Sequence, residues 1–356
     1  MWLHKLQAHA LRSFIDLDLS FEPGINVLYG DNGVGKTSIL EGIDILSRGK
    51  SFRTTKLSQI INYDLTEFIL YGEVCSDDHI HKLGIKHKDH QSELHLNQQK
   101  VKKWSEFASI LPIIDIHPET YLLVMGGPIE RRKFLNWGAF HVEPSFLSTW
   151  SEYSKAVKQR NICLKTRKIS EARNWHHVLH EKGTEISSIL AKYCSNLTPF
   201  VQGLIKEFGF MDQIELTYKP GWDLDRELSD LLEEELLENE VPYVTQVGPH
   251  RGDLGIRWHG HQFAKTSSRG QQKIISIVLK LAQAELLKSS CDKSCVYLVD
   301  ELPAELDINK KKTALTLLAS LNSQVIISAV TKESIDYQNM SAKWFHVEHQ
   351  SVSSVV

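Results

Sequence analysis

The sequence predicts an α/β fold that is interrupted by an inserted, mainly helical second domain, and three observations support this. A glycine-rich loop at residues 30–37 lies between a short apolar run and a helix-like segment. Residues 296–299 and 325–327 are continuous apolar runs, typical of strands in a parallel sheet that is covered on both faces. In the middle of the chain, apolar residues recur at helical spacing over residues 146–164 and 178–197.

Composition sets limits on the function. The chain has 356 residues, enough for two domains, and its 42% hydrophobic and 24% charged residues are typical of globular proteins. No apolar run approaches the length of about 18 residues that a membrane span needs. Five cysteines without a C-x-x-C pair predict a reducing, cytoplasmic location. Because the net charge is -3, binding to nucleic acid requires positive charge gathered on one face or shared with another subunit.

The N-terminal part is predicted to form a series of strands. Residues 15–21 alternate between apolar and polar side chains, which predicts a half-buried strand, and Pro23-Gly24 predicts the turn after it. Residues 68–71 and 94–96 read as further strands of a lobe that ends near Asp115. This lobe carries five lysines, for which we expect a solvated surface, with contacts to a DNA backbone as the alternative. They are Lys86, Lys88, Lys100, Lys102 and Lys103.

The glycine-rich loop has the pattern G-x-x-x-x-G-K-T of a phosphate-binding loop. Its glycines let backbone N–H groups converge on phosphate oxygens, and the helix that follows adds positive partial charge there. We expect Lys36 to reach the β- and γ-phosphates of a nucleotide and the Thr37 hydroxyl to bind Mg²⁺. The alternative is a glycine-rich turn that matches by chance. The predicted loop consists of Gly30, Asp31, Asn32, Gly33, Val34, Gly35, Lys36 and Thr37.

The middle of the chain is predicted to be mainly helical, with two long antiparallel amphipathic helices. Arg160, Lys165, Arg167 and Lys168 are expected to form a charged helix end, with a DNA contact as the alternative. Residues 223–240 predict a strongly acidic helix.

After Val241 the α/β pattern returns with a hairpin around residues 259–261 and a helix over 271–287. We therefore expect one split head, residues 1–116 and 241–356, and an inserted helical domain, residues 117–240. The last residues, 351–356, are expected to form a loose tail.

Two further motifs carry chemistry. The apolar run 296–299 ends in Asp300 and Glu301. At the end of a buried strand, the first carboxylate can hold Mg²⁺ and the second can polarise a water for attack on the γ-phosphate. Residues 267–272 open a long helix with a hydroxyl and a glycine, which is either a second anion site or an N-cap and nothing more. Together with the phosphate loop, the second anion site suggests a nucleotide shared between two copies of the chain.

These motifs resemble those of the RecF family of bacterial recombination mediators, whose ABC-type ATPase heads are similar to those of SMC proteins. Four stretches carry the resemblance: residues 30–37 with 47–53, 118–119 with 126–136, 248–254 with 268–273, and 300–301 with 304–307.

The resemblance implies that Lys36, Thr37 and Asp300 hold ATP and Mg²⁺, with Glu301 as general base. It implies that Ser268, Gly270 and Gln271 bind the nucleotide of a second copy, so that ATP drives head-to-head dimerisation. Residues Ala304 to Asp307 would form a loop at the dimer interface, and the insertion would form a short arm.

The function that the resemblance implies is ATP-dependent binding to duplex DNA at single-strand gaps. With RecO- and RecR-type partners the protein would help to load RecA, using slow, DNA-stimulated ATP hydrolysis as a switch. Three rivals are an ATPase subunit of a transporter, an ATP-gated protein scaffold that does not act on DNA, and an ATPase coupled to a nuclease.

Some residues depart from the family pattern or stand apart from it. Asn136 replaces an acid, His117 lies near the place of a phosphate-sensing glutamine, and Thr331 is the expected substitute for a switch histidine. His250-Arg251 is expected at an interface or near a phosphate. Three other histidines lie about one turn apart on a predicted helix, and we expect them to form a surface cluster, with a metal site as the alternative. They are His176, His177 and His180.

Overall fold

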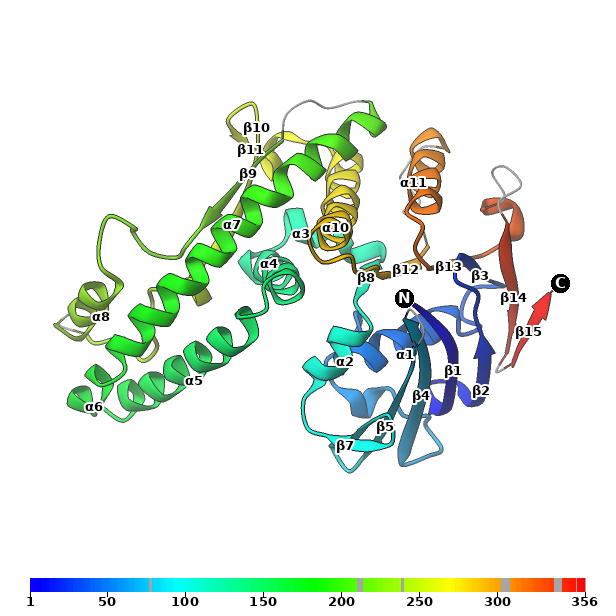
Figure 1. Ribbon diagram of the computed structural model, residues 1–356, viewed down its shortest axis with the longest axis horizontal. Coiled ribbons are helices and arrows are strands. Elements are labelled where there is room, and N and C mark those ends of the chain that lie inside the picture. Colours follow the sequence, from blue (N-terminus) through cyan, green and yellow to red (C-terminus); the bar gives the residue numbers. More distant parts are fainter. Residues whose placement is uncertain are drawn as a thin grey trace. The chain divides into compact units, whose positions relative to one another are not determined.

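The computed structural model describes residues 1–76, 79–209, 214–237, 240–301, 308–335, 341–349 and 351–355. The chain forms two compact units, whose elements are labelled in Figure 1. Unit 1 comprises Met1–Thr120 and Asp292–Val356, and unit 2 comprises Tyr121–Cys291. Within the described residues, no helix has both the length and the apolar character that crossing a bilayer requires.

A six-stranded sheet in unit 1 positions the motifs. Its order is β15-β14-β3-β13-β12-β8, and all its strands except β15 run parallel. The buried strands β12 and β13 contain the apolar runs predicted at 296–299 and 325–327, which confirms those two strands. The strands are β3 (Ile25–Tyr29), β8 (Ile113–Ile116), β12 (Val296–Asp300), β13 (Val325–Ala329), β14 (Ala342–Glu348) and β15 (Ser351–Val355).

The prediction of a loose tail at the C-terminal end is wrong. Ser351–Val355 forms strand β15, which pairs antiparallel with β14. The edge of β14 offers unpaired backbone groups, and a short chain end that reaches it gains hydrogen bonds.

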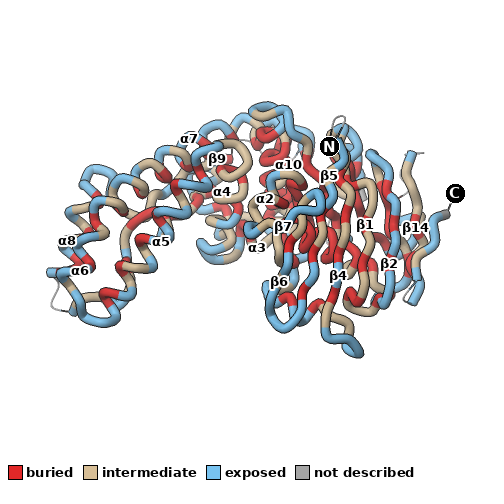
Figure 2. The backbone as a smooth tube through the Cα atoms, turned by 60° about the horizontal axis from the view of Figure 1, so that its bottom comes forward, coloured by how far each residue is buried: buried red, intermediate tan, exposed pale blue. Residues whose placement is uncertain are grey.

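The second sheet of unit 1 is antiparallel, with the order β2-β1-β4-β5-β6-β7. Along β1, β2 and β4, buried residues mostly alternate with residues that are partly or fully exposed, as Figure 2 shows, because successive side chains in a strand point to opposite faces. The buried side chains share one core with helix α1 (Lys36–Arg48) and with strands of the parallel sheet. The strands are β1 (Trp2–Leu11), β2 (Phe14–Ser20), β4 (Glu67–Ser76), β5 (His79–Lys88), β6 (Gln91–Leu96) and β7 (Gln99–Val101).

Unit 1 also contains helices α2 (Trp104–Ile110) and α11 (Ile308–Ser320) and short 3-10 turns. Of the lysines in its N-terminal lobe, Lys86 and Lys88 pair with Glu67, and Lys100 pairs with Glu93. These exposed pairs fit the solvated surface that we expected.

Unit 2 is mainly helical. Helices α5 (Phe146–Lys165) and α7 (His176–Phe208) pack side by side and run antiparallel, as predicted (Figure 1). A small antiparallel sheet, β11-β10-β9, accompanies them and includes the predicted hairpin. The other elements are α3 (Leu122–Met125), α4 (Pro128–Val142), α6 (Ile169–Arg173), β9 (Ile214–Lys219), α8 (Leu228–Leu237), β10 (Asp253–Trp258), β11 (His261–Gln262), α9 (Phe263–Thr266) and α10 (Arg269–Cys291).

The division by compactness differs from the expected head and insertion. Residues 241–291, expected in the head, belong to unit 2. The reason lies in helix α10, which packs against α3, α4 and α7. Its Gln283 donates hydrogen bonds from Nε2 to the Phe134 carbonyl at 2.8 Å and to the Tyr193 hydroxyl at 2.9 Å.

Candidate functional site

The glycine-rich loop connects β3 to α1, so the predicted order of strand, loop and helix is confirmed. Two of its positions require glycine. Gly35 precedes α1 with φ +113°, and a Cβ there would lie 2.6 Å from the Phe14 ring. Gly30 has φ +150°, and a Cβ would lie 2.2 Å from the Val347 carbonyl oxygen. Both angles are in the region that favours glycine, so the loop keeps a shape that leaves its backbone open to a ligand.

The Lys36 side chain folds back into this loop. Its Nζ donates hydrogen bonds to the carbonyl oxygens of Gly30, at 2.6 Å, and Asp31, at 2.8 Å. Burial lowers the pKa of Lys36, although the carboxylates of Glu301, Asp300 and Asp31 act in the opposite direction. The ammonium group is thus held within the loop, where a phosphate would supply a stronger acceptor than a carbonyl.

Thr37 and Asp300 come together although they are 263 positions apart. The Thr37 hydroxyl lies 2.9 and 3.1 Å from the two Asp300 carboxylate oxygens. A hydroxyl and a carboxylate are oxygen ligands of the kind Mg²⁺ prefers, and this ion commonly completes its shell with phosphates and water. The pair therefore fits Mg²⁺. In the described part of the chain there is no cluster of three or more His, Cys, Asp or Glu side chains that could hold a metal alone.

Ser328 is a residue that the sequence reasoning missed. Its hydroxyl donates a hydrogen bond to Asp300 Oδ1 at 2.9 Å and accepts one from the Glu301 N–H at 3.0 Å. It lies opposite Asp300 in the parallel pairing of β12 with β13. In the sequence, the only indication of this role is that a polar residue directly follows the apolar run 325–327.

Glu301 has a strained backbone. Its φ is +53°, in the left-handed region. For a residue with a side chain, this conformation is about 1–2 kcal/mol higher in energy than the right-handed one. Such strain often accompanies functional sites. The side chain is exposed beside Asp300 and lines the same cavity as Lys36.

These residues line a cavity of about 940 Å³ in unit 1. Lys36, Thr37, Asp300 and Glu301 lie on its wall, together with loop residues Asn32, Gly33 and Gly35. Arg12, Asn62 and the 99% exposed Tyr63 also line it. The volume falls in the range of ligand pockets, and a polyphosphate at the loop would leave an aromatic ring and polar groups for the rest of a nucleotide.

Two residues expected to act on the phosphate lie in different places. His117 lines the large cavity together with Asp300. Thr331 instead lines a separate hollow of about 600 Å³, with Tyr29, Gly30 and Asp31. The structure thus brings His117, but not Thr331, to the wall that carries Lys36.

The predicted second anion site lies in unit 2, at the start of α10. The Ser268 N–H donates to Gln271 Oε1 at 2.8 Å, and the Gln271 N–H donates to Ser268 Oγ at 3.3 Å. This is the reciprocal arrangement of a capping box. Ser268 is exposed, and a Cβ on Gly270 would meet no atom within 4 Å, so this helix start is open to solvent in one chain.

The predicted loop Ala304 to Asp307 lies outside the described residues.

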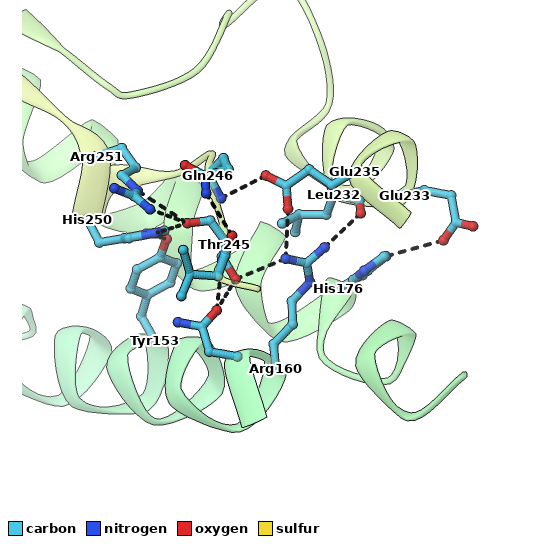
Figure 3. A network of polar contacts seen from close by, with 12 residues as sticks. Tyr153, Arg160, His176, Leu232, Glu233, Glu235, Thr245, Gln246, His250 and Arg251 are labelled. Carbon is cyan, nitrogen blue, oxygen red and sulfur yellow. Dashed lines mark hydrogen bonds and ion pairs between the residues drawn. The ribbon is translucent and has the colours of Figure 1, made fainter. Parts of the chain in front are cut away.

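His250 and Arg251 are engaged inside unit 2, as Figure 3 shows. The His250 Nδ1 lies 2.7 Å from the Tyr153 hydroxyl, and its Nε2 lies 3.1 Å from the Thr245 carbonyl oxygen. The Arg251 guanidinium donates to the same carbonyl at 3.0 and 3.2 Å. Burial lowers the pKa of His250 to about 4, so the ring is neutral. These contacts give the His250 ring a structural role inside unit 2, and the expected role of His250-Arg251 at an interface or near a phosphate stays a prediction.

Arg160 also departs from expectation. It is fully buried instead of forming part of a charged helix end. Its Nη1 donates to Glu235 Oε2 at 2.8 Å and to Thr245 Oγ1 at 2.9 Å, and Nη2 donates to the Leu232 carbonyl at 2.8 Å (Figure 3). A carboxylate from another helix compensates its charge, which spacing along α5 alone does not reveal.

The three histidines of α7 face different acids. His176 pairs with Glu233, His177 with Glu181 and His180 with Glu227. His176 is buried, so the group is only partly the surface cluster that we expected.

Comparisons with known proteins place this geometry in a family. A family model described as the RecF/RecN/SMC N terminal domain matches residues 2–353. The DNA replication and repair protein RecF of Pseudomonas paraeruginosa is 38% identical over 366 residues, covering 99% of this chain and 98% of that protein. The protein with the same description in Stutzerimonas stutzeri is 35% identical, covering 100% and 98%.

Comparison with solved structures supports the same family. A structure of the recombination mediator protein RecF with ATP in the RecFOR pathway matches with a TM-score of 0.90 and 26% identity, covering 99% of both chains. An Smc head bound to the C-terminal winged-helix domain of ScpA matches with a TM-score of 0.60 and 14% identity, which shows a shared fold. The chain therefore belongs to the RecF family, with the ABC-type ATPase fold of that family's heads.

Proposed function

We propose that the protein is an ATP-dependent DNA-binding recombination mediator. The observation that carries the proposal is the contact of Thr37 with Asp300 beside the buried Lys36, at the wall of a cavity of nucleotide size. Lys36 exchanges its carbonyl partners for the β- and γ-phosphates of ATP. Thr37 and Asp300 hold Mg²⁺, which when bound neutralises negative charge on the phosphate oxygens.

Hydrolysis needs a base and a complete site. Glu301 lies at the cavity wall with a backbone bond to Ser328, and it accepts a proton from the attacking water. Ser268, Gly270 and Gln271 of a second copy close over the γ-phosphate, so ATP joins two heads. The exposed, open start of α10 supports this role. Head residues 1–116 and 241–356 then act together in the dimer, with residues 117–240 as the arm.

Membership of the family supports a proposal for the biological role. A relative of 38% identity is described as a DNA replication and repair protein, and a solved neighbour is described in the RecFOR pathway. We infer that the ATP-bound dimer recognises single-strand gaps at duplex junctions in the bacterial cytoplasm. With RecO- and RecR-type partners it helps to load RecA, and slow, DNA-stimulated hydrolysis releases it.

One experiment separates this function from an ATP-gated scaffold that does not act on DNA. Light scattering with and without ATP measures dimerisation, and retention on a gapped duplex at rising salt measures phosphate contacts. We expect ATP to increase both signals. Lys36→Met should abolish the increase, whereas Lys100→Met, at an exposed pair with Glu93, should not. ATP-driven dimers without salt-dependent retention would favour the scaffold, and dimers of Lys36→Met would contradict the site.

A further inference from the structure

Asn32 and Gly33 are the only Asn-Gly pair in the sequence, and they lie inside the phosphate loop. They form a turn between β3 and α1, both are exposed, and both line the cavity that contains Lys36. Among the described residues, neither the Asn32 side chain nor the Gly33 N–H has a hydrogen-bond partner. A backbone nitrogen and a side-chain amide that can react with each other therefore lie side by side, both unbound, in the nucleotide site.

An asparagine that is followed by glycine can react with its own backbone. The Gly33 nitrogen attacks the side-chain carbonyl carbon of Asn32 and forms a new C–N bond. The bond from that carbon to the side-chain nitrogen breaks, and the proton of the Gly33 N–H passes through water to the leaving nitrogen, which departs as ammonia. Water then adds to either carbonyl of the succinimide ring and reopens it as aspartate or isoaspartate. No oxidant or reductant takes part.

The structure favours this reaction at Asn32. A side chain on the following residue would crowd the attacking nitrogen, and glycine has none. Gly33 has φ +83°, and a Cβ there would meet no atom within 4 Å, so the space around the turn is open. By contrast, the side chains of Asn26 and Asn161 are held by hydrogen bonds of 2.7 to 3.0 Å, which restrict the rotation that the attack needs.

The reaction and the binding of phosphate compete for the same N–H group. Backbone N–H groups of a phosphate loop converge on phosphate oxygens. A nucleotide that engages the Gly33 N–H keeps its nitrogen away from the Asn32 side chain. After the reaction, a carboxylate replaces a neutral amide beside the phosphates, and isoaspartate also adds a carbon atom to the backbone of the loop. The added negative charge opposes the binding of a negatively charged polyphosphate.

We propose that Asn32-Gly33 is a deamidation site, which reacts when the phosphate loop is empty and is protected when ATP fills it. A chain that stays empty thereby loses its affinity for ATP, whereas a chain that remains loaded keeps it. The protection rests on the proposed function of the cavity as an ATP site, but the reaction itself does not.

Peptide mapping by mass spectrometry tests the site in the full chain during prolonged incubation without nucleotide. Asn322 is the matched control, because it is exposed, has no hydrogen-bond partner among the described residues and is followed by Ser323 instead of glycine. We expect aspartate and isoaspartate to accumulate at Asn32 several-fold faster than at Asn322. The slowly hydrolysed analogue ATPγS, added with Mg²⁺, should slow the reaction at Asn32 and leave Asn322 unchanged.

Titration with ATPγS measures the consequence for binding. Asn32→Asp imitates one product and should bind ATPγS at least about tenfold more weakly than the wild type, whereas Asn322→Asp should bind it normally. Wild-type protein aged without nucleotide should lose affinity as its modified fraction grows. Asn32→Gln closes the ring far more slowly because its side chain is longer, so it should keep the affinity with which it starts. Circular dichroism checks that each variant folds.

The possible results separate the reaction from the proposed function. Reaction at Asn32 no faster than at Asn322 would overturn the inference. So would an unchanged rate at Asn32 when the protein is saturated with ATPγS, or an Asn32→Asp variant that binds ATPγS as tightly as the wild type. If freshly prepared wild type does not bind ATPγS, the proposed function fails instead, and the comparison of the two asparagines in the empty protein still decides whether the reaction occurs.

Discussion

Replacing Arg160 with alanine tests whether one buried cation organises unit 2. The guanidinium is fully buried and serves three acceptors, which belong to Glu235, Thr245 and Leu232. Glu235 also accepts the Gln246 N–H at 2.8 Å on its other oxygen. Through Thr245, whose carbonyl binds His250, the same network holds the segment before β10.

The expected cost is large because the change leaves a buried carboxylate without its cation. Removing one partner of a buried pair typically costs about 3–5 kcal/mol. The remaining bond from Gln246 satisfies one Glu235 oxygen only, so we expect a loss of about 4 kcal/mol in the free energy of unfolding. A double change, Arg160→Met with Glu235→Leu, removes both charges and should recover most of that loss.

Urea unfolding followed by circular dichroism measures these differences. Arg173→Ala is the matched control, since Arg173 pairs with Glu233 on the exposed surface of the same unit and should change the urea midpoint little. If Arg160→Ala costs no more than this control, or if the double change is worse than the single one, the buried pair does not organise unit 2.

Three further predictions concern the site and its surroundings. Glu301→Gln should bind ATP and remain a dimer without turnover, and normal phosphate release would place the base elsewhere. Ser268→Arg should bind ATP with unchanged affinity yet stay monomeric in sizing experiments, and a surviving dimer would contradict the shared site. Because Asp44 titrates near pH 6 when folded and near 3.8 otherwise, the folded state holds the extra proton. The free energy of unfolding should therefore fall as the pH rises from 4 to 6, by about 2 kcal/mol relative to Asp44→Asn, and parallel pH profiles would refute this.

Local sequence predicted much of the site. The phosphate loop, the strand ending in Asp300 and the capped start of α10 are continuous segments, whose residue types and spacing fix both structure and chemistry. The apolar runs 296–299 and 325–327 form buried parallel strands for the same reason.

Contacts that depend on the register of strands or on the packing of distant segments could not be predicted from the sequence. Ser328 meets Asp300 only because β13 pairs with β12 in one alignment. Arg160 is spaced like a surface residue, but its counter-charge lies 75 positions away. Likewise, the tail at 351–355 is polar and short, and only the open edge of β14 makes it a strand.

The most direct measurement mixes two inactive variants. Lys36→Met lacks the phosphate contact and Ser268→Arg lacks the opposing helix start, so each alone should neither dimerise with ATP nor hydrolyse it. A mixed pair contains one intact site, formed by Lys36 of one chain and Ser268 of the other. We expect ATP-dependent dimers and a measurable part of the wild-type turnover when the two are combined. A mixture as inactive as its components, with both variants folded, would contradict a nucleotide site built from two chains.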